Sequence, residues 1–333
     1  MKKILMIATG GTIASKRTAS GLAPLILSEE LLAYVPAAKA FCEVEALQLL
    51  NLDSSSIEPR HWLMIAAAIR ENYRRYDGFV VCHGTDTMAF TAAGLSYLVQ
   101  NSEKPIVLTG AQKPIDMEDT DARVNLMDSL RFACWDGASG VSVVFGGHVI
   151  AGTRARKMRA KSYDAFESIN FPCLADIRDG QIIPYITNVE TGGGPAFYDR
   201  LNSDILLIKL FPGLSPALLA HVAGHYDAFI LEGFGVGNLS DYEGQSFVDA
   251  VEQLASRGKI VVMATQVTHE GSDIRLYEVV SRLARDYPAL MECRDMTTEA
   301  AVAKLMWILG QTTDPSEVRR LFTATIHHDV LLH

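Results

Sequence analysis

Several features are scarce in this sequence, and each scarcity excludes a class of protein. The five cysteines among 333 residues are scattered and form no Cys-X-X-Cys pair, a pattern that suits a reduced cytoplasm and buried thiols. Lysine and arginine number 30 against 39 acidic residues, giving a formal net charge of -9, so a basic surface for nucleic acid or an anionic membrane is not expected. No apolar segment approaches the length of a membrane span.

Common binding motifs are missing as well. The sequence has no GxxxxGK[ST] phosphate loop, and the glycines after the first apolar run lack the GxGxxG spacing. His221 and His225 have the spacing of a metal pair on a helix, but no acidic residue or third ligand accompanies them, so they are interpreted as surface histidines. The basic start of the chain resembles a signal peptide, but its apolar run is short and is broken by Gly10 and Gly11. We therefore expect a first strand at residues 3–8 and a small polar ligand.

The sequence is organised around residues 79–95. The apolar run 79–82 ends in the polar cluster 83–87, and a helical pattern follows at once, as where a buried parallel strand leads into its crossover helix. In open α/β sheets such a loop lies at the carboxyl edge of the strands, where ligands bind. The alternative is that Asp86 or Thr87 only caps the helix.

The same construction occurs at three other places in the first half of the chain. The strand and loop pairs are residues 3–8 with 9–14, 43–50 with 51–56, and 105–108 with 109–114. Gly10 and Gly11 allow a sharp turn and close approach of the backbone to a ligand, and Thr12 places a hydroxyl beside them. The repetition favours a shared site over isolated helix caps.

The loop at 51–56 has its own structural alternative. Ser56 or Glu58 is suited to cap a helix that begins near a proline at position 59. That interpretation leaves Asp53, Ser54 and Ser55 without an obvious structural role. We therefore keep these three residues as candidates for ligand binding.

The order of elements predicts an α/β fold with two α/β domains. Residues 1–185 are expected to form a larger N-terminal domain with a doubly wound, mostly parallel sheet. Residues 186–203, rich in breakers and without period, are expected to be a linker, and residues 204–333 a smaller C-terminal α/β domain. Residues 15–24 show no period and are expected to form a lid, whereas Gly146-Gly147 predicts a hairpin.

The most basic run of this acidic protein spans residues 153–161. Such a run usually forms a solvated face, but here it follows a strand, so one of its cations could turn toward Asp86. A threonine hydroxyl is a weak nucleophile that needs a nearby base, and a partly buried lysine can supply one. Glycine-rich loops offer backbone N–H groups to a developing oxyanion. The chemistry that this combination suggests is acyl transfer to water.

Two of these segments are similar to the signature motifs of the bacterial-type L-asparaginases. They are residues 9–14, Thr-Gly-Gly-Thr-Ile-Ala, and residues 83–87, His-Gly-Thr-Asp-Thr, in the order the family has them. Residues 53–55, 109–114 and 235–238 also fit, so the resemblance covers nearly the whole chain. The Asp-Ser-Ser form of residues 53–55 and the absence of a leader resemble the cytoplasmic, type I branch.

The resemblance implies hydrolysis of L-asparagine to L-aspartate and ammonia, without metal or cofactor. It implies that Thr12 is the nucleophile of an acyl-enzyme and that Thr85, Asp86 and Lys157 form the activating group. The substrate-binding residues it implies are Asp53, Ser54, Ser55, Thr85, Asp86, Ala111 and Asn238. It further implies a homodimer or homotetramer, with no nucleic acid or membrane as partner.

Two departures from the family pattern accompany the resemblance. The family's lid usually bears a tyrosine that helps to activate the first threonine, and here Leu22 follows Gly21. Some type I relatives have an effector site with an arginine where Glu232 stands, so allostery is not predicted. Alternative functions are a glutaminase-asparaginase of mixed specificity, a transamidation subunit, or an amino-acid sensor that kept the pocket. The transamidation subunit usually carries an extra N-terminal domain, which the position of Thr12 close to Met1 argues against.

Overall fold

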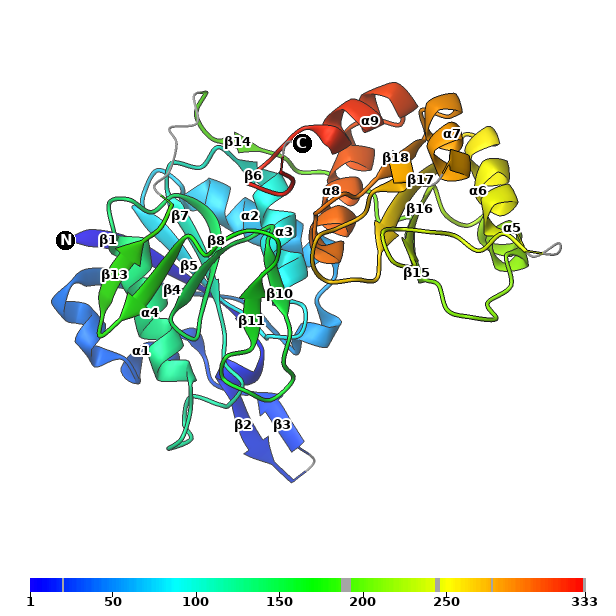
Figure 1. Ribbon diagram of the computed structural model, residues 1–333. Helices are drawn as coiled ribbons and strands as arrows, with labels where there is room; N and C mark the ends of the chain where they lie inside the picture. The colour runs from blue at the N-terminus through cyan, green and yellow to red at the C-terminus, as the bar shows by residue number, and fades with distance from the viewer. Residues whose placement is uncertain (20, 187–192, 243–245, 277, 332–333) are drawn as a thin grey trace. The chain divides into compact units, whose positions relative to one another are not determined.

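The computed structural model describes residues 1–19, 21–186, 193–242, 246–276 and 278–331. The chain forms two compact units, Met1–Asp199 and Arg200–His333. Each is an α/β unit built on a sheet (Figure 1), which confirms the predicted fold class with the larger unit first. Part of the predicted linker, residues 187–192, lies outside the described residues.

The first unit contains one large sheet and several short strand pairs. Its strands are β1 (Lys2–Gly10), β2 (Ser15–Thr18), β3 (Gly21–Pro24), β4 (Cys42–Leu52), β5 (Gly78–Cys82), β6 (Val99–Gln100), β7 (Pro105–Thr109), β8 (Gly140–Phe145), β9 (His148–Ala151), β10 (Ala155–Lys157), β11 (Phe166–Ser168), β12 (Ala175–Arg178), β13 (Gln181–Pro184) and β14 (Ala196–Phe197). Its helices are η1 (Thr12–Ala14), α1 (Ser28–Ala33), η2 (Pro36–Ala40), η3 (Ser54–Ser56), α2 (Pro59–Asn72), α3 (Met88–Leu98) and α4 (Ala122–Cys134). The large sheet has the order β13-β12-β9-β8-β7-β5-β1-β4.

The middle of this sheet is buried on both faces. In β1, Ile4 and Met6 point to one face and Leu5 and Ile7 to the other, and all four are buried. Ile4 and Met6 belong to one core cluster with residues of α1 and α4, whereas α3 contacts β7 and β8 and packs against α2. Burial on both faces explains why these strands are almost continuously apolar in the sequence.

The parallel strands bring their polar loops to one edge of the sheet. Strands β4, β1, β5, β7 and β8 are mutually parallel. At the carboxyl ends, Ala8 is paired with Cys82, and Cys82 with Thr109. The loops that follow β1, β5 and β7 therefore leave the sheet side by side, as the sequence predicts.

Two strand pairs test the local predictions. The hairpin across Gly146-Gly147 is confirmed, because β8 and β9 pair antiparallel with Phe145 opposite His148. Within the segment 15–24, in which the sequence shows no period, residues 15–18 and 21–24 form an antiparallel ribbon of β2 and β3 (Figure 1). The sequence gives no sign of these strands because the only buried residue in them is the polar Ser15, so no apolar side marks the period.

The second unit has a four-stranded parallel sheet in the order β15-β16-β17-β18. Its elements are β15 (Ile205–Lys209), α5 (Ala217–Val222), β16 (Ala228–Gly233), α6 (Phe247–Ser256), β17 (Ile260–Thr265), η4 (Ile274–Leu276), α7 (Glu278–Asp286), β18 (Leu290–Glu292), α8 (Thr298–Gln311) and α9 (Pro315–Thr323). Thr297 caps α8 by accepting the backbone N–H of Ala300. A fully buried ion pair of 2.7 Å joins Lys304 of α8 to Asp329 near the C-terminus. Among the described residues, no helix is both long and apolar enough to cross a membrane.

Candidate active site

The loops after β1 and β5 touch through two glycines. Gly10 and Gly11 have φ of +104° and +78°, values that favour glycine. A Cβ atom added to Gly11 would lie 2.3 Å from the Cα atom of Gly84, so no larger residue fits between the loops. Thr12 and Thr85 each follow one of these touching glycines, so the contact brings the two threonine loops together.

Thr12 is the first residue of η1 and is half-buried. Within the described residues its hydroxyl has no hydrogen-bond partner, which leaves it available to a ligand. The backbone around it is held firmly, because the carbonyl of Ile13 accepts the N–H of Ile115 at 3.2 Å. The N–H of Gly11 donates to the carbonyl of Leu52 at 2.8 Å, so this N–H is already bonded within the protein.

Lys157 reaches from β10 to the loop after β5. Its ammonium donates to the Thr85 hydroxyl at 2.8 Å and lies 2.6 Å from a carboxylate oxygen of Asp86. The lysine side chain is 17% exposed, whereas that of Asp86 is 66% exposed. The prediction that one cation of the basic run turns toward Asp86 is confirmed. The interpretation of Asp86 as only a helix cap is wrong, because its carboxylate forms an ion pair with Lys157 and the N-cap residue of α3 is Thr87.

The Thr85 hydroxyl is bonded on two sides. It accepts from Lys157 and donates to the side-chain oxygen of Gln112 over 3.3 Å. The side-chain amide of Gln112 in turn donates to the carbonyl of Ser162 at 3.1 Å. The backbone N–H of Gln112 donates to the carboxylate of Asp121. The sequence assigns Gln112 no role beyond membership of its loop, because only the fold shows that its amide reaches Thr85.

A second cation of the basic run is also turned inward. Arg154 is fully buried, donates to the carbonyl of Ile169, and lies 5.5 Å from the ring centre of Phe171. Met158 and Arg159 farther along the run are exposed. Within the run, Arg154 therefore belongs to the core, Lys157 to the candidate site, and Met158 and Arg159 to the surface. The charge pattern of the sequence does not reveal this division.

The loop after β4 packs beneath the loop of Asp86. Ser54 is buried; its hydroxyl accepts the N–H of Asp86 at 3.3 Å and its carbonyl accepts the hydroxyl of Thr87 at 2.7 Å. Ser55 donates its N–H and hydroxyl to Asp53, and these bonds hold the pKa of that carboxyl below its usual value. Asp53 is therefore an anion at neutral pH, exposed at the same edge as Asp86.

The other predicted site residues are placed as follows. Glu58 caps α2 through a reciprocal pair of bonds with His61, which confirms the prediction for that residue. Asp53 is itself the N-cap of η3, since its side chain accepts the N–H of Ser55. Ala111 is fully buried in the main core, so any ligand contact from it falls to its backbone. Asn238 belongs to the second unit, where its side chain accepts the N–H of Leu239 at 2.9 Å, and its contact with substrate stays a prediction.

His83 supports the site from below. It is fully buried; its Nδ1–H donates to the carbonyl of Gly84 at 2.7 Å, since a carbonyl only accepts, and its Nε2 lies 3.0 Å from the hydroxyl of Thr91. Burial lowers the pKa of His83 to about 4, so the ring is neutral and its Nε2 accepts from Thr91. His83 is therefore a packing and hydrogen-bonding residue beneath the loop and not a base.

Acid is expected to destabilise the first unit through His83. Below pH 6.5 His83 is protonated in the unfolded chain, but in the folded protein it stays neutral down to about pH 4. The free energy of unfolding therefore decreases as the pH is lowered from 6.5 to about 4. The drop in pKa of 2.5 corresponds to about 3 kcal/mol. Urea unfolding of the wild type and of His83→Asn at pH 7 and pH 4.5 measures it. An equal loss of stability in both proteins would contradict this assignment.

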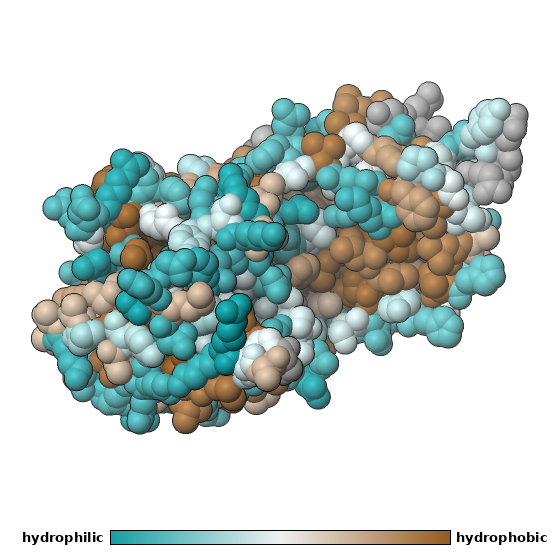
Figure 2. All heavy atoms as spheres, turned by 90° about the horizontal axis from the view of Figure 1, so that it is seen from below, coloured by the Kyte–Doolittle hydropathy of each residue, from teal (hydrophilic) through white to brown (hydrophobic). Residues whose placement is uncertain are grey.

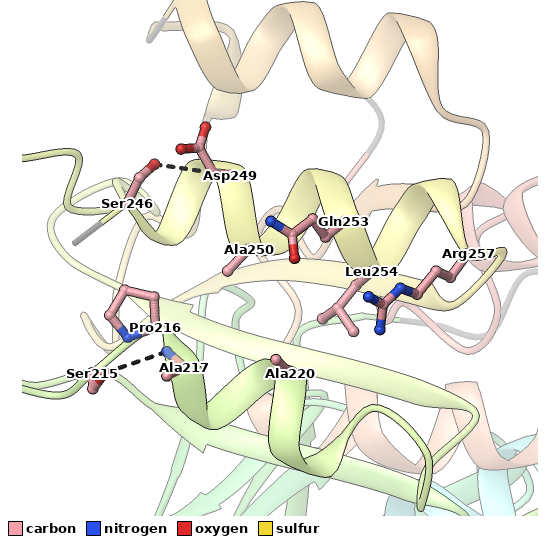
Figure 3. Close-up of a pocket in the computed structure, with 10 residues that line it drawn as sticks. All are labelled: Ser215, Pro216, Ala217, Ala220, Ser246, Asp249, Ala250, Gln253, Leu254 and Arg257. Carbon is pink, nitrogen blue, oxygen red and sulfur yellow. Dashed lines mark hydrogen bonds between the residues drawn. The ribbon is translucent and has the colours of Figure 1, made fainter. Parts of the chain in front are cut away.

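The side chains that meet around Thr85 and Lys157 include no group of three metal-ligating residues among those described. A pocket of about 250 Å³ lies elsewhere, between α5 and α6 of the second unit (Figure 3). Small residues such as Ala217 and Ala220 line it, together with Asp249 and Arg257. Among its described lining residues there is no threonine or lysine, so it offers nothing like the chemistry at Thr85.

Family comparisons agree with the loop geometry. Residues 3–189 match the family model for the asparaginase N-terminal domain, and residues 204–322 match that for the glutaminase/asparaginase C-terminal domain. The chain belongs to the asparaginase family. The family expectation drawn from the two threonine motifs is thus confirmed, and this asparaginase-family protein is an amidohydrolase.

Several relatives of this asparaginase-family chain span its whole length. An L-asparaginase of Thermococcus kodakarensis is 37% identical over 98% of this chain and 99% of its own. The solved structure of the thermostable L-asparaginase from the same organism has a TM-score of 0.92 at 36% identity, covering 99% and 100% of the two chains. L-asparaginase I of Vibrio cholerae gives 0.86 at 29% identity, covering 99% of each chain. A glutamyl-tRNA(Gln) amidotransferase subunit of Pyrococcus horikoshii is 31% identical over 96% of this chain and 74% of its own.

Proposed function

We propose that the protein hydrolyses L-asparagine to L-aspartate and ammonia through an acyl-enzyme on Thr12. The observation that carries this proposal is the contact of Lys157 with both the Thr85 hydroxyl and the Asp86 carboxylate, beside the glycine contact that leads to Thr12. A lysine in hydrogen-bond reach of a hydroxyl is the arrangement that proton transfer needs. The full-length similarity to L-asparaginases supports the substrate.

The reaction has two balanced steps. In the first, the Thr12 oxygen attacks the side-chain amide carbon of the substrate, its proton passes by way of Lys157 and Thr85 to the amide nitrogen, and ammonia leaves. In the second, water attacks the ester carbon, gives a proton back along the same route, and releases L-aspartate with the Thr12 hydroxyl restored. The free hydroxyl of Thr12 and the bonded hydroxyl of Thr85 support this division of roles.

The charged residues at the edge of the sheet suit the rest of the substrate. The α-ammonium of an amino acid needs an anion, and Asp53 and Asp86 supply exposed carboxylates. The α-carboxylate needs donors; we propose that the hydroxyl of Ser55 turns from Asp53 to the substrate, and that the main chain of Ala111 and the side chain of Asn238 add further contacts. Ser54 acts by joining the loop of Asp53 to that of Asp86.

Release of ammonia from L-asparagine and L-glutamine at matched concentrations tests the proposal. We expect kcat/KM for L-asparagine to exceed that for L-glutamine by about 10-fold or more, since a pocket separates two ligands differing by one methylene by roughly 1–3 kcal/mol. Similar kcat/KM values for the two amides would favour a glutaminase-asparaginase of mixed specificity. We keep this as the second candidate because one relative of the chain is a subunit of a glutamyl-tRNA(Gln) amidotransferase. No ammonia from either amide would favour the sensor.

We further propose that copies of this chain associate as a homodimer or homotetramer. β15 ends the four-stranded sheet, so one of its edges has no partner strand among the described residues. Figure 2 shows hydrophobic residues gathered in a continuous area on the second unit. The exposed apolar residues of this unit include Leu207 of β15 and Phe211. Light scattering after gel filtration measures the mass, and a monomer at micromolar concentration would exclude the assembly.

A cytoplasmic location stays a prediction. It is supported by a Campylobacter jejuni relative described as a probable cytoplasmic L-asparaginase. The solved structure of that relative has a TM-score of 0.82 at 25% identity, covering 97% of this chain and 99% of its own.

A further inference from the structure

A cluster of His148, Cys173 and Asp176 lies outside the proposed catalytic residues. One ligand atom from each residue, an imidazole nitrogen, the thiol sulfur and a carboxylate oxygen, lies within 4.8 Å of the other two. His148 lies in β9 and Asp176 in β12, the neighbouring strand of the large sheet, whereas Cys173 lies two residues before β12 begins. None of the three residues has a part in the proposed hydrolysis.

The sheet holds the three residues in place. β9 and β12 pair antiparallel with His148 directly opposite Asp176, so their side chains are cross-strand neighbours on one face. The N–H of Leu174 donates to the carbonyl of Val149 at 2.7 Å, which fixes the backbone next to Cys173. Strand pairing therefore sets the positions of His148 and Asp176, and the bond of Leu174 to β9 fixes the short segment that carries Cys173 just before β12.

We propose that His148, Cys173 and Asp176 form a binding site for a borderline-soft divalent cation such as Zn²⁺. Bonds of about 2.0–2.3 Å around tetrahedral zinc place its ligand atoms roughly 3.3–3.8 Å apart. His148 Nδ1 and Asp176 Oδ1 are 2.9 Å apart, so small side-chain rotations reach that geometry. One sulfur, one nitrogen and one oxygen ligand suit Zn²⁺, whereas Mg²⁺ and Ca²⁺ prefer oxygen ligands alone.

The surroundings of the cluster allow a cation to enter and orient one of its ligands. The side chain of His148 is 41% exposed and Cys173 is half-buried, which leaves room for water as a fourth ligand. Arg178 and the hydroxyl of Tyr185 bond to Oδ2 of Asp176, at 2.6 and 3.0 Å, and leave Oδ1 for the metal. The guanidinium of Arg178 opposes a second cation, so we expect weaker binding than at a four-ligand structural site. On binding, the Cys173 thiol loses its proton to solvent.

Titration of the full-length, chelator-treated protein with Co²⁺ tests the site. The wild type should bind one equivalent and develop the near-ultraviolet absorption of a cobalt–thiolate bond, and Zn²⁺ should displace it. In Cys173→Ser the absorption should be lost, and in His148→Gln and Asp176→Asn the affinity should fall by about 10-fold or more. Cys134→Ser, which removes another half-buried cysteine of the first unit, should behave like the wild type.

The proposal would be overturned by either of two results. One is the absence of stoichiometric Co²⁺ binding in the wild type; the other is an unchanged cobalt–thiolate absorption in Cys173→Ser. Circular dichroism and the melting temperature of each variant without metal confirm that it is folded, and His148→Gln provides an independent variant if Cys173→Ser is not. Zn²⁺ should raise the melting temperature of the wild type and leave that of Cys173→Ser unchanged.

Discussion

Replacing Thr12 by alanine should lower kcat for ammonia release from L-asparagine by roughly 10⁴-fold or more, as loss of a nucleophile does in other acyl-transfer enzymes. The melting temperature should hardly change. Thr12 is half-buried and its hydroxyl has no partner among the described residues, so the substitution breaks no hydrogen bond and opens no large cavity. Steady-state ammonia assays and a thermal melt of the same preparation measure both effects.

Thr12→Ser is the matched control because it keeps the hydroxyl and removes only a methyl group. It should retain far more activity than the alanine variant. The acyl-enzyme has its own test: hydroxylamine competes with water for the ester, so the wild type should form aspartate β-hydroxamate in proportion to added hydroxylamine without faster release of ammonia when deacylation is not limiting. Activity that persists in Thr12→Ala but disappears in Thr85→Ala would move the nucleophile to Thr85.

The parts of the fold that the sequence predicts are those fixed by local pattern. The apolar runs before Gly10, Gly84 and Gly110 are strands because both of their faces are buried, and buried parallel strands are apolar throughout. Their loops meet because parallel strands share one carboxyl edge, a rule that needs no knowledge of side-chain contacts. That a cation of the basic run turns inward is predictable as well, because the run follows a strand and so begins near the sheet.

What the sequence does not predict depends on residues brought together from distant positions. Arg154 is buried against Ile169 and Phe171, and neither neighbour is marked by the charge pattern. His148 and Asp176 become neighbours only through the pairing of β9 with β12, a pair that local pattern does not reveal. Polar contacts of this kind are set by strand order and register, which one sequence does not disclose.

Lys157→Met should lower kcat by about 10²–10⁴-fold, the usual contribution of a general base. Methionine fills a similar volume but has no ammonium group. The contacts of 2.8 Å to Thr85 and 2.6 Å to Asp86 are therefore lost. Lys161→Met is the matched control, because Lys161 is an exposed lysine of the same run and its loss should leave turnover unchanged. Equal activity of Lys157→Met and the wild type would return the whole run to a structural and surface role.

Lys157→Arg separates two ways in which the lysine could act. If Lys157 only holds the Asp86 carboxylate and the Thr85 hydroxyl in position, a guanidinium can donate the same bonds and much of the activity should remain. If Lys157 accepts a proton during each step, arginine fails, because its guanidinium does not lose a proton in proteins. We expect Lys157→Arg to be as inactive as Lys157→Met with KM within a few fold of the wild type, since a guanidinium still donates to Asp86 but, unlike lysine, cannot give up a proton and act as the base.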